Sequence, residues 1–286
     1  MNVAEPQSPL LRRLYQGYMA AFFLYLAAPL VVAGVFAFND SLFPSMPWKG
    51  WTLAWFFSDK EPMIGLLHDR RLLASMWTSA KVGVAVSALS VFVGTTNAFL
   101  FERHDFPGKR YLFVLMVVPL VIPGVILGIS ILVFASMIAN GVEETIGWDW
   151  GMLRPGLPLV VLGQFSFLTT LTSLVIAARL KKFDPALEEA ALNLGASRGR
   201  VLRTITLPYL APALISAFIV AFLVSFENFN TTLMLVGSEA PLTITMYDRI
   251  AKVGSTPVLN AVSFVLMVGS GLLALISIIV QRDRKA

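Results

Sequence analysis

The sequence contains no cysteine and few charged residues for its length. Only 14% of its 286 residues are charged, whereas a soluble domain carries about 25%. The absence of Cys excludes disulfides, thiol catalysis and cysteine-ligated metals, and the two His (His68 and His104) are too far apart to indicate a cluster. The chain also lacks a G-x-x-x-x-G-K-[ST] run, so it has no P-loop of its own. We therefore expect a protein that is not an enzyme and that holds neither a cofactor nor a metal.

Long apolar runs are what the sequence has in abundance. Hydrophobic residues make up 57% of the chain, the mean hydropathy is +0.75, and no run alternates with the period of two that is typical of a β-barrel. A membrane-spanning helix needs about 20 mostly apolar residues, and six segments qualify. They are Leu14–Phe38, Leu73–Leu100, Tyr111–Ala139 (interrupted by Pro119 and Pro123), Leu159–Leu180, Leu210–Val236 and Val258–Val280. The predicted fold is an all-α membrane protein with six transmembrane helices, surrounded by membrane lipid.

The basic residues indicate how these helices are oriented. The first segment could be a cleaved signal peptide or a retained membrane helix, since Arg12 and Arg13 precede it as basic residues precede a signal. At 25 residues it is longer than the apolar region of a signal peptide, so we expect a retained helix. Lys and Arg are twice as frequent on the side that holds both termini, which predicts cytoplasmic N and C termini. The net charge of +5 is explained by the same rule, so no nucleic-acid partner is expected. The predicted parts are a cytoplasmic tail 1–13, a transmembrane permease domain 14–280 with a cytoplasmic loop 181–208, and a cytoplasmic tail 281–286.

The loop 181–208 carries its own helix signals. Asp184 is a good N-cap, Pro185 suits the first helical position, and Glu188 and Glu189 lie where the helix dipole favours negative charge. Gly195 can adopt the left-handed conformation that ends a helix.

The apolar face of this predicted helix needs a partner. The face contains small and aliphatic residues: Ala186, Leu187, Ala190, Ala191 and Leu194. From the residues alone, docking to another protein and packing under the chain's own bundle remain equally open. Ser197 can cap a second helix, which is expected to end near Leu207, ahead of Pro208.

The same loop resembles a known family signature. The run Glu189-Ala190-Ala191, three residues, Gly195, nine residues, then Ile205-Thr206-Leu207-Pro208 is similar to the EAA motif of ABC-importer permeases, EAA-x3-G-x9-I-x-L-P. The six-span layout also resembles a type I ABC importer permease of the bacterial inner membrane. The resemblance implies a coupling helix that docks on a separate ATP-binding subunit dimer, which would carry ATP and Mg. The implied coupling residues are Glu188, Glu189, Ala190, Ala191, Gly195, Leu207 and Pro208, and the implied partners also include a second, different permease subunit and an extracytoplasmic solute-binding protein.

A polar cluster inside the fifth segment is the candidate substrate path. Glu227 lies there with Asn228 and Asn230, and Gln164 belongs to a weaker polar stripe in the fourth segment. Charge within a bilayer is costly, so an intramembrane carboxylate is a functional candidate. The alternative is a network of hydrogen bonds between helices.

Within the importer family, the chain most resembles the spermidine/putrescine branch. Phe38-Asn39-Asp40-Ser41 and Gly254-Ser255-Thr256-Pro257 are similar to that branch, which commonly has two adjacent aspartates where this chain has Glu227 and Asn228. The resemblance implies a polyamine substrate, with an opine or amino-acid-like solute as the alternative. Two other classes, an ion-gradient-driven secondary transporter and an intramembrane enzyme, both leave the motif in the loop 181–208 unexplained.

Overall fold

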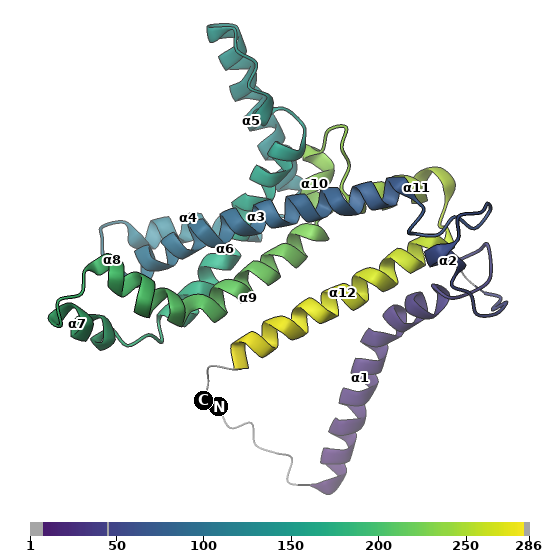
Figure 1. The fold of residues 1–286 in the computed structure, drawn as a ribbon, viewed down its shortest axis with the longest axis horizontal. Coiled ribbons are helices and arrows are strands. Elements are labelled where there is room, and N and C mark those ends of the chain that lie inside the picture. Colours follow the sequence, from purple (N-terminus) through teal and green to yellow (C-terminus); the bar gives the residue numbers. More distant parts are fainter. Residues whose placement is uncertain (1–7, 45, 283–286) are drawn as a thin grey trace. The chain divides into compact units, whose positions relative to one another are not determined.

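The computed structural model describes residues 8–44 and 46–282, and these residues are almost entirely helical or in loops. No β-sheet forms among them; extended residues pair only in an isolated bridge between Asn39 and Trp51. The helices long and apolar enough to cross a membrane are Pro9–Phe36, Arg70–Arg103, Gly124–Ile146, Leu157–Leu180, Arg198–Phe226 and Pro257–Val280. The prediction of an all-α membrane protein with six spans is therefore confirmed (Figure 1).

The chain divides into two compact units. The smaller unit combines Met1–Arg70 with Arg249–Gly269, and the larger one combines Arg71–Asp248 with Ser270–Ala286. The short elements η1 (Gly151–Leu153) and α11 (Leu242–Val253) connect longer helices.

Small and hydroxyl-bearing residues hold the larger unit together. Its core helices are α3 (Arg70–Arg103), α6 (Leu157–Leu180) and α9 (Leu207–Phe226). At Gly94 of α3, an added Cβ would lie only 2.4 Å from Thr172 Oγ1 of α6, and that hydroxyl donates to the Ser90 carbonyl at 2.7 Å. Lipid supplies no hydrophobic driving force between spans, so close backbone approach and interhelical hydrogen bonds are what stabilise the packing.

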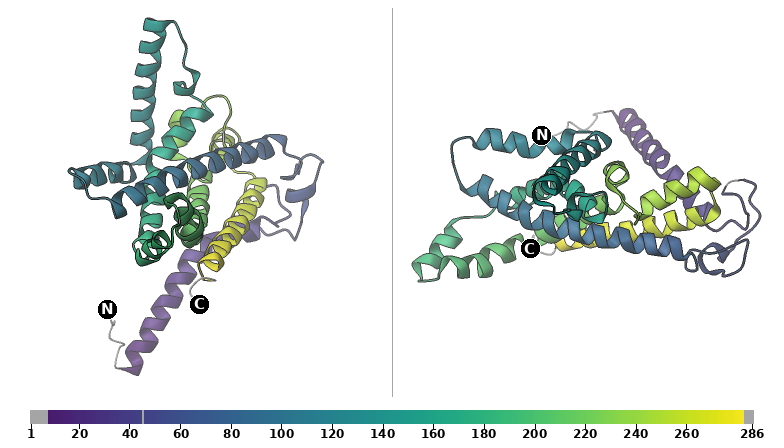
Figure 2. Two further views of the ribbon diagram at one scale, coloured as in Figure 1. Left: turned by 60° about the vertical axis from the view of Figure 1, so that its left-hand side comes forward. Right: turned by 90° about the horizontal axis from the view of Figure 1, so that it is seen from above.

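The predicted third span is two separate helices. Instead of one segment over Tyr111–Ala139, α4 (Lys109–Val121) and α5 (Gly124–Ile146) meet at a corner (Figure 1, Figure 2). The break falls at Pro123, whose preceding residue is extended with a ψ of 131°, as proline sterics favour. Pro119 stays inside α4 without ending it. Only α5 is long and apolar enough to span on its own.

The predicted second helix of the cytoplasmic loop does not end before Pro208. Helix α8 (Arg198–Val201) continues through five residues of π-helix, η2 (Leu202–Thr206), into α9. The Leu207 N–H reaches back to the Leu202 carbonyl, which leaves Pro208 in the first turn of α9, where its missing N–H disrupts little. The prediction of an end near Leu207 was therefore wrong, and one helical rod covers Arg198–Phe226.

The predicted fifth span also ends differently. We expected an unbroken helix over Leu210–Val236, but α9 stops at Phe226 and a short helix, α10 (Asn230–Leu235), follows after three residues. The polar cluster expected inside a helix is thus a break in one.

Aromatic contacts organise the smaller unit. It contains α1 (Pro9–Phe36), α2 (Ala54–Phe57) and the first half of α12 (Pro257–Arg282). The Phe38 ring packs on Phe56 and Phe264, with centroids 5.2 and 5.0 Å apart.

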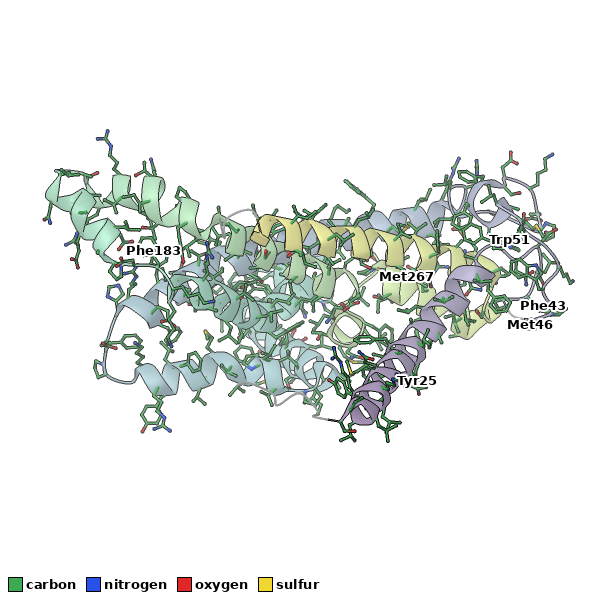
Figure 3. All side chains as sticks on the ribbon, turned by 90° about the horizontal axis from the view of Figure 1, so that it is seen from below. Tyr25, Phe43, Met46, Trp51, Phe183 and Met267 are labelled. Atoms are coloured by element: carbon green, nitrogen blue, oxygen red, sulfur yellow. The ribbon has the colours of Figure 1, made fainter. Side chains whose placement is uncertain are left out.

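The loop after α1 exposes a second group of apolar side chains. Phe43, Met46 and Trp51 lie together in the loop that follows α1, and each is at least 65% exposed (Figure 3). Most of α1 is also exposed, as expected for a helix that meets lipid or another protein chain.

Candidate functional site

The loop between α6 and α9 forms the helix that the sequence predicts. Helix α7 covers Ala186–Asn193, with Glu188 and Glu189 in its first turn. Asp184 Oδ1 accepts a hydrogen bond from the Ala186 N–H at 3.0 Å, so its side chain satisfies one of the free donors at the helix start. The formal cap is one residue later than predicted, at Pro185.

A left-handed glycine ends α7 as predicted. Gly195 has a φ of +85°, its N–H donates to the Leu192 carbonyl at 2.9 Å, and the Ala196 N–H donates to the Ala191 carbonyl at 3.0 Å. This pair of bonds is a Schellman motif. Two residues later, Ser197 Oγ accepts from the Arg200 N–H, which confirms the second predicted cap. Both ends of α7 are therefore defined by local hydrogen bonds.

The predicted apolar face of α7 is largely exposed. Leu194 is 90% exposed and Leu187 52%, Ala190 is exposed, and Ala191 is half-buried. Glu189 is exposed too, whereas Glu188 is half-buried and turned toward the bundle. Of the two alternatives for this face, packing under the chain's own bundle is not what the structure shows.

Leu207 and Pro208 lie apart from α7 along the chain, at the start of α9, where both are half-buried. A hydrogen bond links the two regions: the Thr206 hydroxyl donates to Glu188 Oε1 at 2.5 Å. The structure therefore brings the two ends of the motif together through a residue, Thr206, that the sequence reasoning did not single out.

The break after α9 displays the candidate carboxylate. Asn228 Oδ1 accepts hydrogen bonds from the Thr232 N–H (3.2 Å) and hydroxyl (3.1 Å), so this side chain caps the first turn of α10. Glu227 is exposed, and among residues 8–44 and 46–282 its carboxylate has neither a hydrogen bond nor an ion pair. Asn230 is exposed beside the same break. An exposed, unpaired carboxylate between two helix segments can bind a cationic group of a solute.

Gln164 occupies a different position in this network. It is 1% exposed, its Oε1 accepts from Ser225 Oγ, and its Nε2 donates to Thr232 Oγ1 at 2.8 Å. The amide thus joins the end of α9 to α10 across the break. Of the four predicted path residues, Gln164 is buried and hydrogen-bonded to both helices that flank the break, and Asn228 caps α10. Glu227 and Asn230 are exposed at the break. Ser225 and Thr232 belong to the polar cluster visible in the sequence, but their pairing with a residue more than sixty positions away is visible only in three dimensions.

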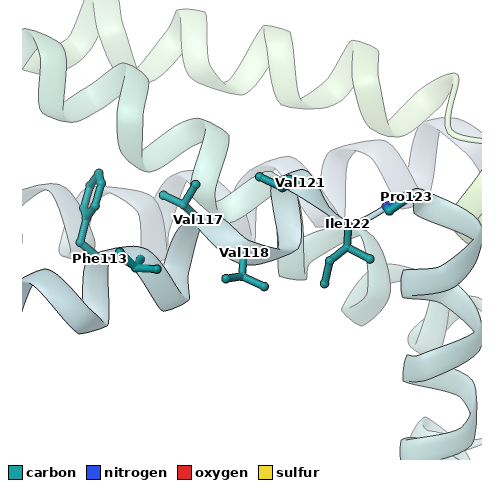
Figure 4. Close-up of a pocket in the computed structure, with 7 residues that line it drawn as sticks. Phe113, Val117, Val118, Val121, Ile122 and Pro123 are labelled. Carbon is teal, nitrogen blue, oxygen red and sulfur yellow. The ribbon is translucent and has the colours of Figure 1, made fainter.

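The remaining surfaces offer weaker sites. Within the described residues, no three His, Asp or Glu side chains lie close enough together to hold a metal ion. A hollow on α4, next to the corner at Pro123, is lined almost wholly by aliphatic and aromatic side chains (Figure 4). It has no charged group with which to bind a polar solute.

Comparison with known proteins identifies the family. Residues 87–285 match the family described as "Binding-protein-dependent transport system inner membrane component". The chain is 28% identical to the putrescine transport system permease protein PotI of Escherichia coli K12, over 89% of this chain and 86% of that protein. It is also 28% identical to the spermidine/putrescine transport system permease protein PotC of the same strain, over 96% of each chain.

The fold is similar to that of a solved transporter. A chain of a bacterial alginate ABC transporter, crystallised in complex with an alginate pentasaccharide-bound periplasmic protein, superposes with a TM-score of 0.72 at 17% identity, over 96% of this chain and 94% of that one. At this identity the likeness concerns the fold alone. The family match, the related permeases and the six apolar helices agree with one another. The chain therefore belongs to the binding-protein-dependent transport system inner membrane components, as a multi-pass permease subunit of an ABC importer in the bacterial inner membrane.

Proposed function

We propose that this permease imports a polyamine such as putrescine or spermidine, driven by a separate ATP-binding subunit that docks on α7. Three kinds of support differ in weight. The exposed, capped helix supports the docking, the names of the related permeases support the substrate class, and the free carboxylate of Glu227 supports a cationic solute.

The observation that carries the docking is the surface of α7. A helix of eight residues, closed at both ends by its own hydrogen bonds, exposes Leu187, Ala190 and Leu194 together with Glu189. Exposed apolar side chains on a helix outside the membrane-spanning segments indicate a contact with another protein. The small side chain of Ala190 permits a close backbone approach.

The chemistry of ATP belongs to that partner. Because this chain has no P-loop, ATP and Mg would be held by the ATP-binding subunit dimer, whose closure would move α7. We further propose cytoplasmic termini, an extracytoplasmic solute-binding protein that delivers the substrate, and a second, different permease that completes the path. The excess of Lys and Arg on the side of α7 supports the orientation.

The substrate proposal rests on charge. A polyamine carries several ammonium groups, and one exposed carboxylate at the break can pair with one of them; an opine or amino-acid-like solute also carries an ammonium group and remains the alternative. Asn228 within the break and Asn230 at the start of α10 add neutral hydrogen-bonding groups.

Uptake assays with the full gene cluster test the proposed substrate class. The cluster should be expressed in a bacterial host that lacks polyamine importers, and uptake of radiolabelled putrescine and spermidine measured per assembled complex. We expect Glu227→Gln to lower uptake about tenfold or more, because the substitution keeps the shape but removes the negative charge that would pair with an ammonium group. Glu144→Gln, which neutralises an exposed carboxylate on α5, is the matched control and should transport normally. Uptake of an amino acid but of neither polyamine would reject the substrate class.

A further inference from the structure

Two adjacent glutamates in the first turn of α7 face in different directions. Glu189 is exposed, with the surface that we assign to docking, whereas the carboxylate of Glu188 is directed at the chain's own helices. Glu188 Oε1 accepts a hydrogen bond from Thr206 Oγ1 at 2.5 Å and lies 3.5 Å from Nη2 of Arg103. The side chains of Arg103 and Glu188 are 22% and 25% exposed, so water screens this pair only in part.

The two partners of Glu188 belong to different helices. Arg103 is the last residue of α3, and Thr206 is fully buried in the last position of the π-helix that leads into α9. One carboxylate thus connects α7 to both. Short π-helical turns inside α-helices are frequently found at functional sites. Because Thr206 ends this turn and α9 begins at the next residue, a contact that fixes Thr206 also fixes the start of α9.

Aromatic rings hold the arginine in place. The Arg103 guanidinium lies over the Phe183 ring, 5.3 Å from its centroid, and Phe183 is 5% exposed at the base of the loop (Figure 3). Phe183 packs edge-on against Tyr209 of α9, with centroids 5.0 Å apart, and Arg179 of α6 covers the Tyr209 ring at 4.3 Å. Arg103 Nη2 is buried and has no hydrogen-bond acceptor among the described residues, where its one ion-pair partner is Glu188.

We propose that Glu188 is a positioning residue that braces α7 against α3 and the start of α9, so that movement of α7 is transmitted to the spans. This inference rests on the proposed docking of an ATP-binding subunit on α7, and assigns opposite tasks to the two glutamates. Glu189 belongs to the surface that meets the partner, and Glu188 belongs to the connection behind it. Without the contacts of Glu188 to Arg103 and Thr206, α7 can move with the ATP-binding subunit while α3 and α9 do not move with it. Each ATP hydrolysed then imports less solute.

Variants of Glu188 and Thr206 separate these tasks. Glu188→Ala removes both contacts, while Glu188→Gln keeps an acceptor for Thr206 but leaves Arg103 half-buried without a counter-charge. Thr206→Val removes the hydroxyl at nearly constant volume, and Thr206→Ser retains it. Glu102→Gln, a neutralisation of the exposed carboxylate beside Arg103, is the matched control.

The decisive quantity is the number of solute molecules imported per ATP hydrolysed, measured on the complete transporter reconstituted in vesicles. We expect Glu188→Ala and Thr206→Val to lower this ratio at least about fivefold, the lower end of coupling between sites, with Glu188→Gln intermediate. Thr206→Ser and Glu102→Gln should keep the wild-type ratio, and the ATP-binding subunit should co-purify in normal amounts with all five variants. A structural role alone would lower the amount of assembled complex without changing the ratio.

Three results would overturn the brace. They are an unchanged ratio in Glu188→Ala, equal ratios in Thr206→Val and Thr206→Ser, and a loss of the ATP-binding subunit in Glu188→Ala, which would assign Glu188 to the docking surface. The proposed docking fails separately, if Glu189→Lys leaves co-purification of the ATP-binding subunit intact.

Discussion

Substitution of Gly195 tests whether docking of the ATP-binding subunit depends on the left-handed backbone at the end of α7 or on the size of the side chain there. The φ of +85° is a left-handed conformation, which costs an L-residue roughly 1–2 kcal/mol. A Cβ at this position would meet nothing within 4 Å, so the cost of a larger residue is one of backbone conformation and not of steric clash. The predicted order of function is therefore Gly, then Asn, then Ala, then Val, because Asn tolerates positive φ and β-branched residues resist it most.

The size of the effect on docking follows from two backbone hydrogen bonds that form only when residue 195 is left-handed. If Gly195 leaves the left-handed region, the bonds to the Leu192 and Ala191 carbonyls are lost, and the last turn of α7 unwinds next to Leu194. A penalty of about 1–2 kcal/mol lowers the population of the intact turn by a factor of about 5–30. We expect retention of the ATP-binding subunit by the solubilised permease to fall in the same order, with normal amounts of permease in the membrane.

The control is a second glycine in the same loop. Gly199 lies in α8, has no positive φ, and would accept a Cβ without a contact within 4 Å, so Gly199→Ala adds a methyl group without backbone strain. Retention should be unchanged in Gly199→Ala and reduced in Gly195→Ala. Equal retention by Gly195→Asn and Gly195→Val would refute the conformational reasoning, since it would mean that side-chain size alone decides.

Three further outcomes follow from the structure. Gly94→Ala places a methyl group 2.4 Å from Thr172 Oγ1 and should destabilise the purified protein by about 1–3 kcal/mol in thermal unfolding, whereas Gly269→Ala, which meets nothing within 4 Å, should not; equal melting temperatures would contradict the packing of α3 on α6. Asn228→Asp keeps the acceptor for Thr232 and adds a second carboxylate, so uptake should shift toward spermidine over singly charged amines, and an unchanged ratio of the two would place residue 228 off the path. A reporter joined after the C-terminal residue should be active in the cytoplasm and one inserted after Gly147 should be active outside, and the opposite pair of signals would reverse the orientation.

The helix in the loop 181–208 was predictable because its signals are local. Asp184, Ser197 and Gly195 each act within four residues of their own position, so cap and turn chemistry reports them without knowledge of the fold. The exposure of α7 is of another kind, since it depends on what the rest of the chain leaves uncovered. Sequence reasoning could therefore place the helix but not decide whether it packs inward.

The two broken spans show where local signals fail. Pro119 and Pro123 look equivalent in the sequence, yet only Pro123 ends a helix; near Pro119 the Thr170 hydroxyl of α6 donates to the Met116 carbonyl, a contact that stabilises α4 from outside. The break after Phe226 has no proline or glycine to announce it.

At that second break, side chains compete with the backbone. The Asn228 side chain accepts a hydrogen bond from the Thr232 N–H in place of a backbone carbonyl. Gln164 of α6 hydrogen-bonds to Ser225 before the break and to Thr232 after it. The first contact is of a type that short polar residues often make, but the second depends on tertiary packing. A hydropathy pattern can place a polar cluster within a span without revealing that the helix stops there.

The uninterrupted rod from Arg198 to Phe226 has a mechanical consequence. At about 1.5 Å per residue its 29 residues measure roughly 40 Å, about the thickness of a bilayer with its headgroups. A tilt of about 10° around the loop end would displace the other end by roughly 7 Å, more than one helical turn. The displaced end is the one that presents Glu227, and the three-residue gap before α10 allows it to move without carrying α10 along. A small angular motion at the loop is thereby enough to move the Glu227 carboxylate by more than one helical turn.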